Sequence, residues 1–121
     1  MRNAVFAGLI AAGLIAGTAL AQPPGLKDQH GAKADAKGMA LYTYDMDTMK
    51  GMSHCEGRCA EVWPPVIAAP NAKASGDWTL VPRGGNVKQW AYKDKPVYTF
   101  ARDKAGEKGT GESIPNWKLL K

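Results

Sequence analysis

The sequence predicts a small, mainly β single domain of short antiparallel strands and hairpins, with one short helix. Runs of aromatic and β-branched residues are short and end in Gly, Pro, Asn or Asp, as strands bounded by turns do. A strand-plus-turn pattern occurs twice, which indicates two related units. Helical periodicity is nowhere sustained beyond about three turns after residue 38.

Each predicted element has its own local signal. Aromatic and β-branched composition predicts strands over 39–44, 77–81, 87–92, 96–101 and 117–120. The third and fourth of these flank a three-residue connection, 93–95, and so predict a hairpin. Good helix formers over 55–62 predict a helix of about two turns. That helix is expected to end before Trp63-Pro64, because a residue that precedes proline is disfavoured in the helical region.

The chain is expected to divide into three parts. Residues 1–21 are predicted to be a signal peptide: Arg2 supplies the positive start, an uncharged apolar run follows, and Ala19-Leu20-Ala21 is a small-x-small cleavage signature. Residues 22–38 hold Leu26 as their only large aliphatic side chain, which predicts a flexible linker. Residues 39–121 contain all four tryptophans and all four tyrosines, and are expected to form the folded domain.

Composition and charge exclude several classes of function. The formal net charge of the whole chain is +5, and removal of the predicted leader takes away only one charged residue, Arg2. The remaining basic residues are spread along the chain without an Arg-rich block, so nucleic-acid binding is not expected. The apolar run of the leader is shorter than the roughly 20 residues of a membrane span, so none is expected after cleavage. The size of the domain excludes large-fold enzymes.

The repeated pattern is an aliphatic residue, Tyr, Thr, an aromatic residue, two variable residues and Asp. Because alternate residues of a strand point to the same face, the two aromatics of each copy are expected to share one core. The aspartates, just past the strand ends, are expected to accept backbone N–H bonds and fix the turns. The motif residues are Tyr42, Tyr44 and Asp47 in the first copy, and Tyr98, Phe100 and Asp103 in the second.

These motifs resemble a family of secreted proteins and lipoproteins described by Tyr-x-[Phe/Trp/Tyr]-x-x-Asp, a secreted repeat of unknown function. Residues 55–65, CEGRCAEVWPP, are similar to a Cys-x-Gly-x-Cys-Ala-x-x-Trp-Pro-Pro segment of that family, and Asn116-Trp117-Lys118 is similar to its closing strand. The resemblance covers residues 39–121 and implies an envelope location and a shared fold, without an established activity. The chain lacks the anchoring cysteine of the lipoprotein members.

Cys55 and Cys59 are the only cysteines, and in an exported chain the expected state is one disulfide. Their spacing places them about 6 Å apart on one helical face, within bridging range. A redox-active Cys-x-x-Cys spacing is not present, and Ala60 stands where covalent haem attachment needs a histidine.

Methionine and histidine side chains gather between the first repeat motif and the cysteines. Thioether sulfur suits Cu(I) and imidazole also binds copper, so the sequence predicts a copper site made by Met46, Met49, Met52 and His54. The alternative is that these methionines fill space under a loop or are incidental there. Asp45 and Asp47 suggest a calcium loop, but its remaining ligands are missing.

The resulting prediction is a non-enzymatic exported protein of the cell envelope, most simply periplasmic, that acts as a small binding or interaction module. Its first specific version is copper binding through this loop. A second hypothesis is a module that binds another envelope protein or a glycan through exposed aromatics. A weaker third is a hydrolase that uses Asp47 and Asp103 as a carboxylate pair, which requires both to line one cleft.

Overall fold

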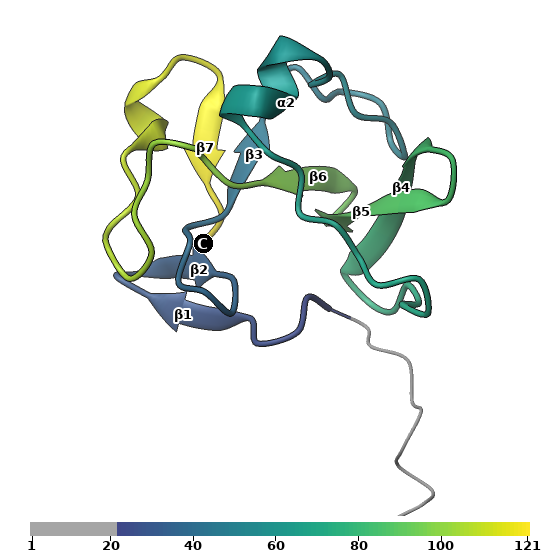
Figure 1. Cartoon of the computed structure of the whole chain (residues 1–121), viewed down its shortest axis with the longest axis horizontal. Coiled ribbons are helices and arrows are strands. Elements are labelled where there is room, and N and C mark those ends of the chain that lie inside the picture. The colour runs from purple at the N-terminus through teal and green to yellow at the C-terminus, as the bar shows by residue number, and fades with distance from the viewer. Residues whose placement is uncertain (1–21) are drawn as a thin grey trace, which may run out of the picture.

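The computed structural model describes residues 22–121, so the predicted signal peptide lies outside the described residues. Within residues 22–121, no helix has the length and apolar character that crossing a membrane requires. Seven strands, one short α-helix and one 3-10 helix make up this part of the chain (Figure 1), which confirms the mainly β class.

Five strands form one antiparallel sheet in the order β4-β5-β6-β3-β7. Their bounds are β3 Tyr42–Tyr44, β4 Trp78–Gly84, β5 Val87–Tyr92, β6 Lys95–Tyr98 and β7 Trp117–Leu119. Strands β3 and β6, which carry the two repeat motifs, are neighbours in the middle of the sheet. The two repeats therefore meet along one strand pair.

A second, two-stranded sheet corrects the expectation of a flexible linker over 22–38. Strands β1 (Lys27–Gln29) and β2 (Ala32–Ala34) form a hairpin whose turn, His30-Gly31, has two residues with positive φ. The Lys33 N–H donates to the Leu120 carbonyl, and the Leu41 N–H donates to the Lys33 carbonyl. Small buried alanines and backbone hydrogen bonds hold the hairpin against the domain. A prediction based on the number of large apolar residues does not detect such packing.

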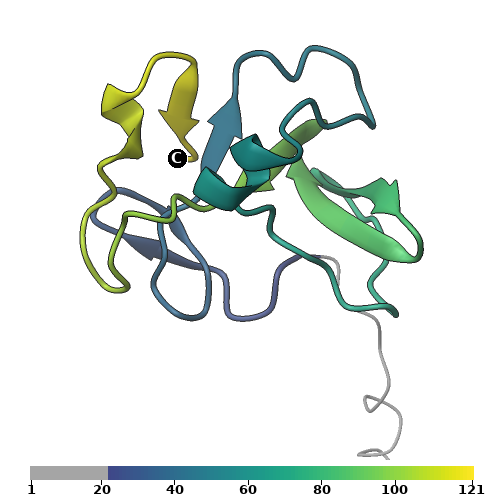
Figure 2. The same ribbon diagram turned by 45° about the horizontal axis from the view of Figure 1, so that its top comes forward.

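The helix is shorter than predicted. Helix α2 spans Arg58–Val62, because Gly57 before it has a positive φ of 62° that is incompatible with a helix. It ends at Trp63, before the two prolines, as the sequence predicts. Figure 2 shows α2 lying close to β3 and β6. A short 3-10 helix, η2 (Gly111–Ser113), which the sequence did not reveal, precedes β7.

The β5–β6 hairpin has a tighter connection than expected. Tyr92 pairs with Lys95, so the turn contains only Lys93 and Asp94, with φ of 49° and 69°. Two successive left-handed residues are typical of the type I′ turn that matches the twist of a hairpin. Thr99 leaves β6 and donates its N–H to the Pro64 carbonyl instead, because the segment after α2 runs across this end of the strand.

Two cores lie on the two faces of the sheet. One contains Tyr42, Tyr98 and Phe100 with buried tryptophans. The other contains Leu41 and Val97, the residues that directly precede the two motif tyrosines. This alternation confirms that the motif aromatics share one face while the aliphatic residues point to the other.

Candidate functional site

The two repeat motifs exchange hydrogen bonds across the β3–β6 pair. Tyr42 lies directly opposite Tyr98 in the strand register. The Tyr42 hydroxyl donates to Oδ2 of Asp103 at 2.6 Å, and the Tyr98 hydroxyl donates to Oδ2 of Asp47 at 2.6 Å. Each tyrosine thus binds the aspartate of the other repeat. The motif is a reciprocal clasp between two pseudo-symmetric halves.

The same aspartates close two loops of equal length. Asp47 Oδ1 accepts the His54 N–H at 2.6 Å, and Asp103 Oδ1 accepts the Thr110 N–H at 2.9 Å. In both cases the partners are seven positions apart in the sequence. We refer to residues 46–54 as the methionine loop and to residues 102–110 as the equivalent loop. One backbone frame therefore occurs twice, with different side chains.

A buried polar network supports the Tyr98 side of the clasp. The Ser53 hydroxyl lies 2.7 Å from the Tyr98 hydroxyl and accepts from Arg83 Nη1 at 2.9 Å. Arg83 also donates to Gln89 Oε1 and to the Cys55 carbonyl. The sequence does not reveal this network, because Arg83, Ser53 and Gln89 belong to no motif and meet only in the folded chain.

The pKa of Tyr42 and of Tyr98 is raised well above the ordinary 10.0. Burial of the phenol is the largest cause, and the hydrogen bond to an aspartate is the second. The folded protein therefore keeps both phenols protonated at a pH where the unfolded chain ionises them. The protonated phenols contribute fully to the free energy of unfolding below about pH 10. That contribution is lost progressively as the pH rises towards the pKa values of the two tyrosines in the folded protein.

We expect the free energy of unfolding to fall above about pH 10, by about 1.4 kcal/mol per pH unit for each of the two tyrosines. Urea unfolding at a series of alkaline pH values measures the slope. Tyr98→Phe, which cannot ionise, should make the slope shallower by about the contribution of one tyrosine. An unchanged slope in that variant would contradict the assignment.

Stacked aromatic rings fill the core beneath the clasp. Trp63 stacks on Trp117 with ring centroids 3.7 Å apart, and on Phe100 at 4.3 Å. All nine aromatic residues within 22–121 are buried or half-buried. The exposed aromatic face required for the glycan or partner hypothesis is therefore not formed by this part of the chain.

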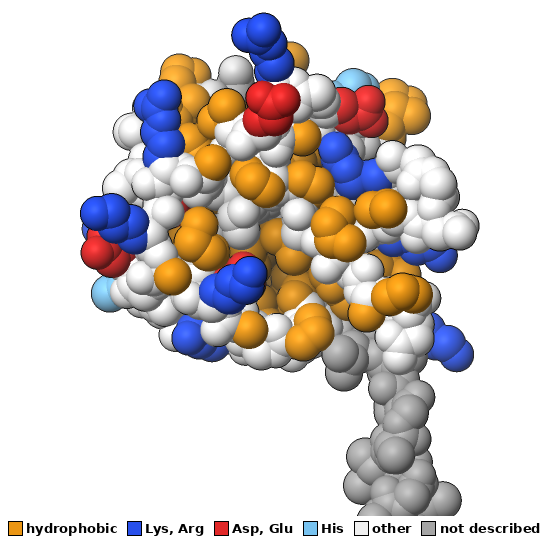
Figure 3. Space-filling view, viewed as in Figure 1, with side chains coloured by type: hydrophobic (Ala, Val, Ile, Leu, Met, Phe, Trp, Pro, Cys, Tyr) orange, Lys and Arg blue, Asp and Glu red, His pale blue; other side chains and the backbone are white. Residues whose placement is uncertain are grey.

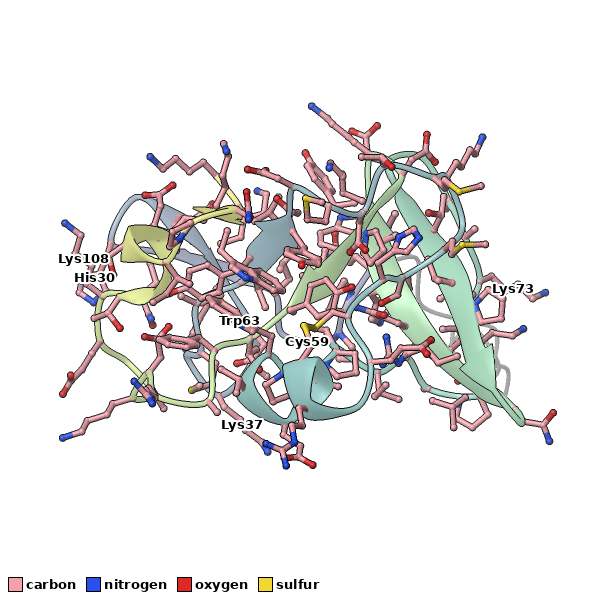
Figure 4. All side chains as sticks on the ribbon, turned by 90° about the horizontal axis from the view of Figure 1, so that it is seen from above. His30, Lys37, Cys59, Trp63, Lys73 and Lys108 are labelled. Carbon is pink, nitrogen blue, oxygen red and sulfur yellow. A yellow bond between two sulfur atoms is a disulfide. The ribbon has the colours of Figure 1, made fainter. Side chains whose placement is uncertain are left out.

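The predicted disulfide is confirmed. Cys55 and Cys59 are bonded, with Cα atoms 5.1 Å apart, and Cys55 is fully buried. Figure 4 shows Cys59 on α2 next to Trp63. The bridge therefore fixes the end of the methionine loop and the start of the helix against the aromatic core.

The methionine loop is held at its base and exposed at its side chains. Met46, Met49 and Met52 have exposed fractions of 53%, 54% and 45%, and the His54 side chain is 44% exposed. Below them Asp47 is 2% exposed, and Lys95 Nζ donates to its carbonyl at 3.1 Å. These methionines do not fill space under the loop.

The equivalent loop serves as an internal comparison. It lies 56 residues further along the chain and has the same aspartate closure without methionine or histidine. The positions of Met46, Met49, Met52 and His54 are taken there by Arg102, Ala105, Lys108 and Thr110. The backbone frame of the loop therefore does not require thioether or imidazole side chains.

The two motif aspartates are engaged within the protein. Both oxygens of Asp47 and both of Asp103 accept hydrogen bonds from the partners described above, and Thr110 Oγ1 adds a bond to Asp103 at 2.8 Å. This geometry favours a structural role over the carboxylate-pair hydrolase. Asp45 pairs with Lys118 at 2.7 Å, and within 22–121 no group of three or more His, Cys, Asp or Glu side chains is arranged to hold a metal ion. The calcium loop therefore has no support.

A shallow groove of ≈ 450 Å³ lies on another part of the surface. It is lined mainly by proline and aliphatic side chains, with Asp35 and Lys37 at its edge. Figure 3 shows hydrophobic side chains gathered around this hollow, with a basic side chain beside it. The groove holds no cluster of catalytic or ligating groups.

Comparison with known proteins assigns the family. A family model described as a secreted repeat of unknown function matches residues 28–67 and 83–121, more than half of the chain. The first match begins within the β1–β2 hairpin rather than at residue 39. Neither a curated protein nor a solved structure matches the chain. The two matched segments correspond to the two halves joined by the tyrosine–aspartate clasp, and the chain belongs to this family of secreted repeats.

Proposed function

We propose that this protein is a periplasmic copper-binding protein that holds Cu(I) on the methionine loop. The ligands are the thioethers of Met46, Met49 and Met52 and the imidazole of His54. The observation that carries the proposal is the exposure of all three methionines on a loop whose backbone is fixed without them. Soft thioether ligands select Cu(I).

The exposure of these methionines is unusual for the residue type. Methionine is normally placed where its adaptable side chain fills gaps in a core. Here three of them are about half exposed within seven residues, next to a partly exposed histidine. Because the equivalent loop keeps the same closure with other side chains, packing does not explain the choice of methionine.

The ligand set is electrically neutral, which favours a monovalent soft ion. Asp47, whose Oδ1 lies 3.7 Å from His54 Nδ1, is buried and accepts hydrogen bonds from the His54 N–H and the Tyr98 hydroxyl. Oxygen ligands suit hard divalent cations, whereas thioether and imidazole suit copper. We therefore expect Cu(I), and its soft analogue Ag(I), to bind in preference to Zn²⁺ or Ca²⁺.

Titration with Cu(I) against a competing chelator of known affinity tests the proposal. We expect one Cu(I) per chain, and a loss of affinity of at least about tenfold, or 1.4 kcal/mol, when Met46, Met49 and Met52 are replaced together by Leu. Leucine keeps the apolar volume but removes the sulfur. Met39→Leu is the matched control, because Met39 is half-buried outside the loop. Equal affinity in the triple variant and the unchanged protein would reject the proposal.

A further inference from the structure

We propose that Met46, Met49 and Met52 form a reversible oxidation site, at which peroxide-class oxidants convert thioethers to sulfoxides and thereby switch off Cu(I) binding. The oxidation site stands on exposure and loop geometry alone, whereas the switch rests on the proposed copper function.

The methionines of the described residues differ in accessibility. Susceptibility of methionine to oxidation follows exposure. The three loop methionines are about half exposed, whereas Met39 is less exposed and its backbone N–H donates to Asp35 Oδ1. Within residues 22–121 there is no free cysteine, since both are in the disulfide. The loop therefore presents the most accessible sulfur on the described surface.

The chemical step is an oxygen-atom transfer. A lone pair of the thioether sulfur attacks one oxygen of hydrogen peroxide, the O–O bond breaks, and a proton shift releases water. Sulfur is oxidised by two electrons to the sulfoxide, and the peroxide is reduced by two. Methionine sulfoxide reductases of both stereospecificities reverse the change with thiol reductants, which become a disulfide as water is released.

The fold is built to tolerate this change. Asp47 holds the base of the loop through the His54 N–H and the Tyr98 hydroxyl, and neither bond involves a methionine side chain. In the equivalent loop, charged Arg102 and Lys108 occupy the positions of Met46 and Met52. A polar sulfoxide at these positions therefore faces solvent and leaves the core packing intact.

Oxidation nevertheless removes the proposed ligands. The sulfur of a sulfoxide keeps only one lone pair and is a much weaker donor than a thioether, and the group presents a hard oxygen, which Cu(I) disfavours. His54 alone remains as a copper ligand of the set. Oxidised protein is therefore expected to release Cu(I), and reduction is expected to restore binding.

The experiment treats the exported, metal-free protein with hydrogen peroxide and follows each methionine by peptide mass mapping. We expect Met46, Met49 and Met52 to gain oxygen at least about five times faster than Met39, with no loss of unfolding temperature. The triple Leu variant serves as the control and should gain oxygen only at Met39. Cu(I) affinity is then measured before oxidation, after it, and after treatment with both reductases.

The outcomes separate the two proposals. Oxidation of Met39 at the same rate, or unfolding of the oxidised protein, would overturn the oxidation site. Full Cu(I) affinity after complete oxidation of the loop would overturn the switch. If the untreated protein does not bind Cu(I), the proposed function and the switch both fail, while the mass map still decides the oxidation site.

Discussion

Replacement of Asp47 by Ala is expected to lower the free energy of unfolding by about 3–5 kcal/mol, measured by urea denaturation. Asp47 is 2% exposed and accepts two hydrogen bonds of 2.6 Å, from the Tyr98 hydroxyl and the His54 N–H. Alanine leaves the phenol and the amide without their acceptor. Hydrogen bonds to charged groups contribute about 1.5–3 kcal/mol each, and buried donors without partners add a desolvation cost.

The pseudo-symmetric partner provides a matched control. Asp103 makes the corresponding bonds to Tyr42 and Thr110 but is more exposed, so Asp103→Ala should cost about 1–3 kcal/mol. Asp45→Ala, which removes a surface ion pair with Lys118, should cost less than about 1 kcal/mol. An Asp47→Ala variant as stable as Asp45→Ala would show that the clasp does not hold the halves together.

Replacement of Trp63 by Ala should also lower the free energy of unfolding by about 3–5 kcal/mol, since large-to-small changes in cores lose both burial and packing. Trp63 is 4% exposed and stacks between Trp117 and Phe100. It also meets Tyr42 edge-on at 5.2 Å. Removal of its ring opens a cavity where both repeats contribute aromatics. Thermal and urea unfolding measure the effect.

A surface truncation of similar chemistry supplies the comparison. Ile67 is 51% exposed, so Ile67→Ala should change stability by no more than about 0.5 kcal/mol. Trp63→Phe keeps part of the aromatic stack, so its loss in free energy of unfolding should lie between those of Trp63→Ala and Ile67→Ala. Equal losses for Trp63→Ala and Ile67→Ala would contradict the view that one aromatic core joins the repeats.

The residues that stabilise the fold differ from those of the proposed copper site. The clasp and the aromatic stack are internal and join both repeats. The methionine side chains are external, and the loop that carries them is held to the scaffold by Asp47 and by Ser53, which contacts Tyr98 and Arg83. The proposed copper ligands are therefore not needed for the fold, and other side chains occupy the same positions of the equivalent loop.

Local patterns in the sequence predicted most of the architecture. Alternation in the motif strands separated Tyr42 from Leu41 and Tyr98 from Val97, and the structure places these pairs in different cores. The prolines after Trp63 predicted where α2 ends. Such features depend on nearest neighbours along the chain, so the sequence alone reveals them.

The amino-acid composition of residues 22–38 does not predict the N-terminal hairpin. Residues 22–38 lack large aliphatic side chains, but Ala32 and Ala34 are buried because the backbone pairs with Leu120 and Leu41 of the domain. Small side chains are sufficient to pack a hairpin against a domain when the surface of the domain approaches the hairpin closely. That surface is formed by distant parts of the chain, so only the folded structure reveals it.

The sequence by itself determined the fold class, the two repeats, the disulfide and the position of a methionine-rich segment. The tertiary structure decided how these parts work together: each tyrosine binds the aspartate of the other repeat, and the methionines lie outside the core. The physical reason is that hydrogen-bond partners and burial depend on groups 51 to 61 residues apart, which no local pattern encodes.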